Sequence, residues 1–294
     1  MPRRCTYECF AILFKKRAKQ NTVTQVSHTK RRKADMHNSA LITEIERFSI
    51  HDGPGIRTTV FLKGCPLHCS WCHNPETISY DAQVMSYPEK CIGCGKCDQG
   101  CFPGAKVICG QPMSTDEVLS EILRDKPYYG EDGGMTISGG EPLSHREFTF
   151  ELLTKCRENK IGTAIETSMY RFDRELLSLC DIIMCDIKIW DSALHKKHVG
   201  IDNLRILDNI RAADSLGIPI IIRTPIVPSI NDTVENVKNT ADFTKALKNV
   251  QKYELLPYHP LGISKAQALG IKMQSFETPT KEKIKELEKY AYIR

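Results

Sequence analysis

No apolar run in the 294-residue chain approaches the roughly 20 residues that span a bilayer, and no hydrophobic signal segment opens it. A strong charge is missing too: the net charge is +5, and 10 of the 41 Lys and Arg residues fall within the first 33. No period of about 20 to 50 residues repeats, which argues against a solenoid. Neither a membrane nor a nucleic acid is indicated as a partner, and we expect a cytoplasmic protein.

Residues 1–38 form a basic tail that is almost free of acidic residues and lacks the apolar pattern of a packed element. Such a composition is typical of an organelle-targeting peptide, and equally of upstream sequence translated from too early a start. Met36 lies just before the ordered pattern begins and favours the second interpretation. We expect the folded core to cover residues 41–294.

Strand-like and helix-like segments alternate about six times along this core. The strand-like runs are Thr58–Leu62, Met135–Ser138, Gly162–Ile165, Ile182–Ile187, Ile218–Ile222 and Tyr253–Leu256. Ser114 and Glu117 form a capping-box pattern ahead of a helix over 116–124, and Gly217 is placed to stop a helix that begins near Asn203. The repeat predicts an α/β fold with a parallel sheet that forms a complete or partial barrel, with its chemistry at the carboxyl ends of the strands.

Thirteen cysteines are many for this length, and in a reducing compartment closely spaced cysteines indicate metal ligands. Cys65, Cys69 and Cys72 follow the first strand at spacings of three and two. Three thiolates from one loop can hold a cubane iron–sulfur cluster that leaves one iron open to a small molecule. The alternative is a structural zinc site completed by His68 or His73.

A second cysteine group lies in residues 81–111, a segment rich in Cys, Gly and Pro that interrupts the alternation. Cys91, Cys94, Cys97 and Cys101 have the spacing of a bacterial ferredoxin, so the segment reads as a small ferredoxin-like insert. No second run is present, so either Cys101 or Cys109 completes an auxiliary [4Fe–4S] cluster. A zinc site or an unoccupied relic is the alternative.

Three motifs agree in order with one known family: Asp52–Arg57, Trp71–Asn74 and Ser138–Pro142. With the first thiol group, they resemble the radical S-adenosylmethionine (SAM) superfamily, and within it the activating enzymes of glycyl radical enzymes such as pyruvate formate-lyase. The resemblance runs from about Ile42 to the C-terminus. It implies a partial (β/α)6 TIM-type barrel, a [4Fe–4S] cluster that binds SAM, and oxidoreductase chemistry in which SAM yields methionine and a 5′-deoxyadenosyl radical.

The resemblance also assigns roles to residues. Cys65, Cys69 and Cys72 are the catalytic cluster ligands, and further positions are expected to line the cofactor: Trp71, His73, Gly139, Gly140, Glu141, Glu166, Thr167, Asp186, Lys188, Arg223 and His259. The Gly-Gly-Glu segment is expected to bind the methionine amino group, and the strand-end acids a monovalent cation. Two positions depart from the family pattern, because Glu166 stands where Asp is common and Met169 where Gly is usual.

The implied partners are a glycyl radical enzyme, whose glycine Cα loses a hydrogen atom, and a flavodoxin or ferredoxin-type electron donor. Two alternatives stay open. One is a radical SAM enzyme that acts on a small molecule or peptide, and the other is a ferredoxin-like electron carrier. The carrier would need no open three-thiol loop and no Gly139–Glu141 segment.

Overall fold

Six apolar segments form the parallel part of one sheet in the computed structural model, which describes residues 38–97 and 100–291. These strands are β2 (Arg57–Leu62), β6 (Gly134–Gly139), β7 (Gly162–Thr167), β8 (Ile182–Asp186), β9 (Ile220–Ile226) and β10 (Val250–Pro257). Every neighbouring pair among them is parallel. All six strands expected from the sequence are therefore confirmed, whereas the basic tail lies almost entirely outside the described residues.

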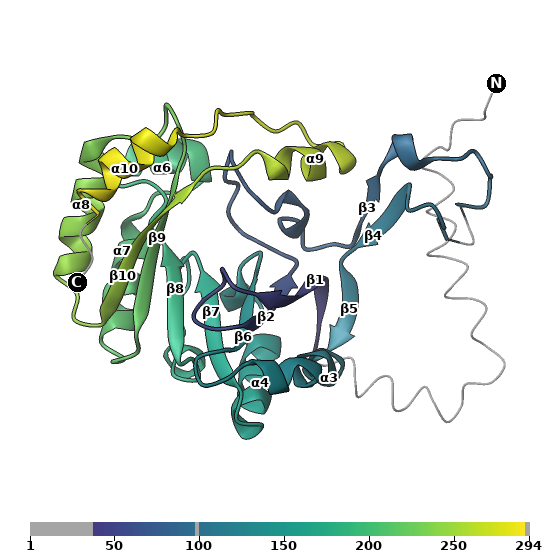
Figure 1. Cartoon of the computed structure of the whole chain (residues 1–294), viewed down its shortest axis with the longest axis horizontal. Coiled ribbons are helices and arrows are strands. Elements are labelled where there is room, and N and C mark those ends of the chain that lie inside the picture. The colour runs from purple at the N-terminus through teal and green to yellow at the C-terminus, as the bar shows by residue number, and fades with distance from the viewer. Residues whose placement is uncertain (1–37, 98–99, 292–294) are drawn as a thin grey trace.

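Two antiparallel strands extend the sheet beyond β2, giving the order β10-β9-β8-β7-β6-β2-β1-β5. They are β1 (Ser39–Ser49) and β5 (Gln111–Ser114). The two ends of this order do not pair, so the sheet is a partial barrel, as the family resemblance implied. A separate two-stranded hairpin, β3 (Gln83–Ser86) and β4 (Lys106–Cys109), carries the cysteine-rich insert and projects from the barrel (Figure 1).

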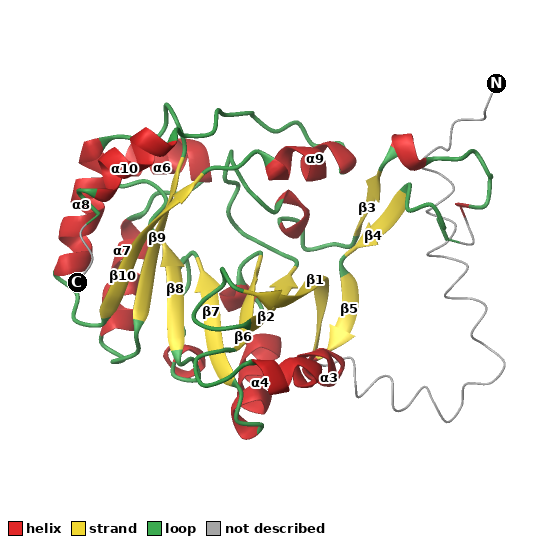
Figure 2. Ribbon diagram, viewed as in Figure 1, coloured by secondary structure: helices red, strands yellow, loops and turns green. Residues whose placement is uncertain are grey.

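Most helices cover the outside of the sheet, whereas the one that follows β10 lies at the carboxyl ends of the strands, against Cys72 (Figure 2). They are α3 (Thr115–Asp125), α4 (Arg146–Glu158), α5 (Arg174–Leu177), α6 (Ser192–Val199), α7 (Leu204–Asp214), α8 (Val234–Lys245), α9 (Leu261–Ala268) and α10 (Lys281–Glu288). Short 3-10 turns occur at η2 (Pro75–Thr77), η3 (Pro88–Lys90), η5 (Lys126–Tyr128) and η6 (Pro142–Ser144). No helix in the described part of the chain combines the length and apolarity that crossing a membrane requires.

The two helix signals predicted from the sequence are present in the structure. Ser114 caps α3, and the reciprocal bond from its backbone to Glu117 completes the capping box. The helix expected from Asn203 is α7, which ends at Asp214. Gly217 lies three residues further on with φ 76° and closes the following turn, since its N–H donates to the Asp214 carbonyl at 3.3 Å.

The main core lies between the sheet and these outer helices. Fully buried side chains such as Ile137, Ile165, Ile183 and Ile222 come from the strands, and Leu152 comes from α4. Continuous apolar strands of this kind are typical of parallel sheets that are covered by helices. The packed outer face leaves the loops at the carboxyl ends of the strands to build a site.

Candidate active site

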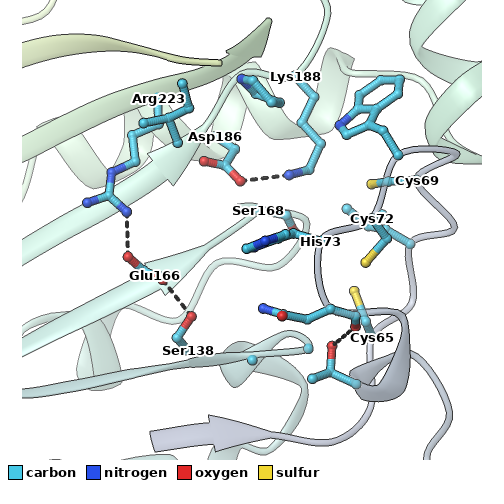
Figure 3. Close-up of a pocket in the computed structure, with 18 of the residues that line it drawn as sticks. Cys65, Cys69, Cys72, His73, Ser138, Glu166, Ser168, Asp186, Lys188 and Arg223 are labelled. Atoms are coloured by element: carbon cyan, nitrogen blue, oxygen red, sulfur yellow. Dashed lines mark hydrogen bonds and ion pairs between the residues drawn. The ribbon is translucent and has the colours of Figure 1, made fainter. Parts of the chain in front are cut away.

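A cavity of about 420 Å³ lies at the carboxyl ends of the parallel strands. Figure 3 shows side chains from the thiol loop on one side and from the ends of β6 to β9 on the other. It is lined by all but one of the residues expected at the catalytic site: Cys65, Cys69, Trp71, Cys72, His73, Gly139, Gly140, Glu166, Thr167, Asp186, Lys188, Arg223 and His259. Because these residues line the same cavity, the separate motifs form one site in the folded chain.

The three thiols face this cavity from the loop that follows β2 (Figure 3). Burial raises the pKa of Cys72 to about 12, and it also raises the pKa values of Cys65 and Cys69. Because metal ligation needs thiolates, binding of iron by these thiols would release protons. Three soft sulfur ligands beside open volume fit an iron–sulfur cluster with a small molecule on its remaining iron.

The zinc alternative would need His68 or His73 beside the three thiols. His68 is exposed and does not line the cavity, whereas His73 does line it. Within residues 38–97 and 100–291, no three or more His, Cys, Asp or Glu side chains are grouped so as to hold a single metal ion.

Gly139 and Gly140 are required by the close packing of β6 against the thiol loop. A Cβ on Gly139, which has φ 105°, would lie 2.2 Å from the Leu62 backbone nitrogen. One on Gly140 would lie 2.3 Å from the carbonyl oxygen of Gly64. Any larger residue would push the strand end away from the loop, so these glycines set the width of the cavity on this side.

Glu141 does not line the cavity, in contrast to the expectation from its motif. Its side chain is fully buried and accepts hydrogen bonds from Thr167 Oγ1 at 2.7 Å, from the Ser168 backbone and hydroxyl, and from the Leu143 N–H at 3.1 Å. These bonds occupy both carboxylate oxygens, because an ionised carboxylate has about four acceptor positions. Glu141 thus ties the end of β6 to the end of β7.

Lys188 and Asp186 form an ion pair of 2.6 Å at the end of β8. Burial alone would lower the pKa of Lys188, but Asp186 and the thiols of Cys69 and Cys65 outweigh it and raise that pKa. The lysine is therefore a fixed positive charge near the thiols. Such a charge suits a carboxylate ligand on that side of the cavity.

Glu166 and Arg223 form a second pair farther from the thiols (Figure 3). Glu166 also accepts from Ser138 Oγ at 2.5 Å, and Arg223 donates to Glu254 at 3.2 Å and to the His51 carbonyl at 3.0 Å. Burial raises the pKa of Glu166 even though Arg223 opposes the shift. The monovalent cation stays a prediction, since both strand-end acids are paired with basic side chains here.

Aromatic side chains cover the apolar part of the site. Trp71 is 5% exposed and contacts Phe276 at a ring-centroid distance of 6.5 Å, and Phe276 in turn contacts Tyr258 at 5.8 Å. Tyr258 was not predicted, although it precedes His259 in the sequence. Its hydroxyl is buried and has no hydrogen-bond partner among the described residues, so it is a donor that a bound molecule could satisfy.

The cysteines of the insert lie away from this cavity. Cys91 and Cys94 are exposed, and Cys97 and Cys101 are partly buried. Cys109 differs, since it is buried in β4 and packs against Met85, Ala268 and Leu269. The fold thus separates one buried cysteine from the ferredoxin-spaced group.

The fold and the three-thiol site define the class of protein. The family model described as "Radical SAM superfamily" matches residues 59–244, and the chain belongs to this superfamily. Its members use a [4Fe–4S] cluster and SAM. The structure of Streptococcus suis SuiB bound to a precursor peptide has a TM-score of 0.54 and 15% identity over 77% of this chain and 42% of that one, and it supports the fold alone.

Curated relatives narrow the class to the activating enzymes of glycyl radical enzymes. The (2S)-3-sulfopropanediol dehydratase activating enzyme of Klebsiella oxytoca is 37% identical, over 79% of this chain and 86% of its own. The pyruvate formate-lyase-activating enzyme of Clostridium pasteurianum is 37% identical over 85% and 95%. The benzylsuccinate synthase activating enzyme of Thauera aromatica is 35% identical over 78% and 82%.

Proposed function

We propose that this chain activates a glycyl radical enzyme by removing a hydrogen atom from a glycine Cα of that partner protein. The observation that carries the proposal is the convergence of three thiols and five strand ends on one cavity, in a chain whose relatives are activating enzymes. A cluster held by Cys65, Cys69 and Cys72 supplies, once reduced, the electron that cleaves SAM into methionine and a 5′-deoxyadenosyl radical.

The chain's own residues bind and orient the reactants. Lys188 offers positive charge to the carboxylate of SAM on the thiol side, and the buried Trp71 and Tyr258 offer apolar surface to the adenine. Arg223 and Glu166 lie at the end distant from the thiols, where they can make hydrogen bonds to the nucleoside (Figure 3). Burial of these groups keeps water from the reacting atoms.

The partner's glycine has to reach this cavity from outside. His259 lines the cavity and is exposed, and Leu256 and Leu261, which also line it, are 39% and 58% exposed. Exposed leucines at the rim of an active site are a suitable contact for a protein segment. We infer that the segment with the target glycine enters past these three residues.

For the insert we propose one auxiliary [4Fe–4S] cluster held by Cys91, Cys94, Cys97 and Cys101. The packing of Cys109 in β4 supports Cys101 as the fourth ligand. We further propose a flavodoxin or ferredoxin-type donor as the source of electrons, and a cytoplasmic location, since many free thiols suit a reducing compartment.

The test is anaerobic. Reconstituted, reduced protein is mixed with SAM and a candidate glycyl radical enzyme, and we expect 5′-deoxyadenosine together with an electron paramagnetic resonance doublet on the partner. The Cys72→Ser protein is the control and is expected to give neither. Turnover of a small molecule with no glycyl signal on any partner would refute the activase function, and no 5′-deoxyadenosine at all would refute the radical chemistry.

A further inference from the structure

A buried lysine closes the base of the loop that carries the three thiols. Lys63 follows β2 directly and is 0% exposed, and its Nζ donates to the carbonyl oxygen of Glu76 and to Gln83 Oε1, the latter at 2.8 Å. All three cluster cysteines lie between Lys63 and Glu76 in the sequence. The bond to the Glu76 carbonyl therefore joins the two ends of the thiol loop, residues 64–75.

Backbone hydrogen bonds repeat this closure. The Gly64 N–H donates to the Thr77 carbonyl at 2.7 Å, and the Cys65 N–H donates to the Ile78 carbonyl at 3.0 Å. Residues on both sides of the thiol loop are thus held together by backbone hydrogen bonds that do not use the thiols. Closing a loop in advance lowers the entropy that its ligands lose on binding metal.

The side chain of Glu76 links the thiol loop to the C-terminal part of the chain. Its Oε1 accepts from Lys265 Nζ of α9 at 2.6 Å, and the same Nζ donates to Asn74 Oδ1 at 2.8 Å. The Glu76 side chain is 9% exposed, and its Oε2 has no partner among the described residues. Lys265 forms the ion pair with this buried carboxylate, and Lys63 is a second lysine close to it, so loss of Lys265 would remove the direct partner of the Glu76 side chain.

Helix α9 also touches the thiol loop and the insert directly. A Cβ added to Gly262 would lie 2.2 Å from the Cys72 carbonyl oxygen, so the first turn of α9 rests on the backbone of a cluster ligand. At its other end, Ala268 packs with Met85 and Cys109 of the insert hairpin. Figure 1 shows α9 above this region, between the barrel and the hairpin.

We propose that Glu76 and Lys265 are positioning residues. Their ion pair holds the thiol loop against α9 and keeps the three thiols in place for the cluster. The inference rests on the proposed function only in assigning the cluster to these thiols. Nothing in the sequence motif of the thiols requires Lys265, which lies 189 residues from Glu76. Residues that orient metal ligands from outside typically change metal affinity by about 10 to 100-fold when they are replaced.

The experiment compares Lys265→Met with Lys265→Arg, and with Lys272→Met as a matched control on an exposed lysine. In cluster-free protein, hydrogen exchange of the amides of residues 64–78 should be faster in Lys265→Met only. In reconstituted protein, a chelator should remove iron about tenfold faster from Lys265→Met. Its reduced cluster should also give an altered paramagnetic spectrum with SAM. Lys265→Arg should behave like the unmodified protein in all three measurements.

Unchanged hydrogen exchange and iron release in Lys265→Met would refute the proposed role of the ion pair between Glu76 and Lys265. If that protein does not fold, Glu76→Gln replaces it, because the amide keeps the size and the backbone carbonyl of Glu76. The double variant Glu76→Gln/Lys265→Met should exchange amide hydrogens and release iron no faster than Lys265→Met alone. Additive effects of the two substitutions would show that the two residues act independently. None of these measurements needs SAM cleavage, so a failed activase assay leaves them interpretable.

Discussion

Met169 is one of four non-glycine residues in the described part of the chain that have a positive φ. It has φ 54°, in the region that favours glycine, and its side chain is 0% exposed. A left-handed non-glycine residue costs about 1–2 kcal/mol, whereas deleting a buried methionine costs about 2–5 kcal/mol. The packing term is larger, which explains why methionine is tolerated where the family usually has glycine.

The first prediction compares two substitutions at this position by urea unfolding. Met169→Gly should lower the free energy of unfolding by about 2 kcal/mol, because the lost packing exceeds the relieved strain. Met169→Ala loses nearly the same packing and keeps the strain, so it should be less stable than Met169→Gly by about 1 kcal/mol. Equal stability of the two variants would show that this backbone conformation is not strained.

The second prediction concerns Glu141, which acts on the cavity through Thr167 and Ser168. In Glu141→Gln, the amide nitrogen would face either the Ser168 N–H or the Leu143 N–H, and because neither N–H can accept, one buried hydrogen bond is lost. We expect the free energy of unfolding to fall by about 1–3 kcal/mol and SAM to bind more weakly. Thermal unfolding and SAM titration measure the two effects. The exposed Glu158→Gln is the control, and unaltered SAM affinity in Glu141→Gln would contradict the positioning role.

At the residue scale, the sequence predicted where the site residues lie better than it predicted what their side chains do. The strand-end residues were placed correctly because a strand's end is a local property, visible in periodicity and glycine placement. The role of Glu141 stays a prediction, and its hydrogen-bond partners could not be read from the motif, because Thr167 at the end of β7 and Ser168 just after it lie 26 and 27 residues away. Tyr258 was missed for a related reason, since an aromatic residue near a strand end is usually core.

At the scale of elements, Cys101 and Cys109 occupy different parts of the insert hairpin. Cys109 lies in strand β4, whereas Cys101 lies in the loop between β3 and β4. Cys109 is buried against Met85 in a regular strand, and its thiol donates to the Glu76 carbonyl oxygen at 3.8 Å. The third prediction is that Cys109→Ser keeps the iron content of reconstituted wild-type protein, whereas Cys101→Ser loses about one cluster's worth of iron. Iron and sulfide analysis measures this. The reverse pattern would make Cys109 the fourth ligand.

The elements that the sequence did not predict have identifiable physical features. β5 contains Pro112 and lies at the edge of the sheet, where a missing N–H is tolerated but where proline argues against a strand assignment. β3 and β4 have four residues each, too few for a periodic signal. The parallel strands were predictable because each contains an apolar run, such as the buried residues 183–185 of β8 and 220–222 of β9.

For the whole molecule, the alternation of strand and helix and the family resemblance predicted the partial barrel, but they did not predict how its distant parts meet. The contact of α9 with the thiol loop joins Lys265 to Glu76, and the contact of β9 with the loop after β1 joins Arg223 to His51. Such pairs leave no periodic trace in a single sequence. They decide the shape of the cavity, because each brings a distant segment against its wall.

The fourth prediction follows from the way the whole barrel builds this cavity. Its wall comes from β6 to β10 and the thiol loop, so bound SAM would connect segments that otherwise separate on unfolding. SAM at 100 times its dissociation constant should stabilise the reconstituted protein by about 2.7 kcal/mol. We expect a much smaller effect after iron is chelated, since the amino and carboxylate groups of SAM then lose their ligand. Methylthioadenosine, which lacks both groups, is the control and should stabilise the two forms equally. Anaerobic thermal unfolding measures these shifts, and a SAM effect that is the same with and without iron would mean that the three thiols do not contribute to SAM binding.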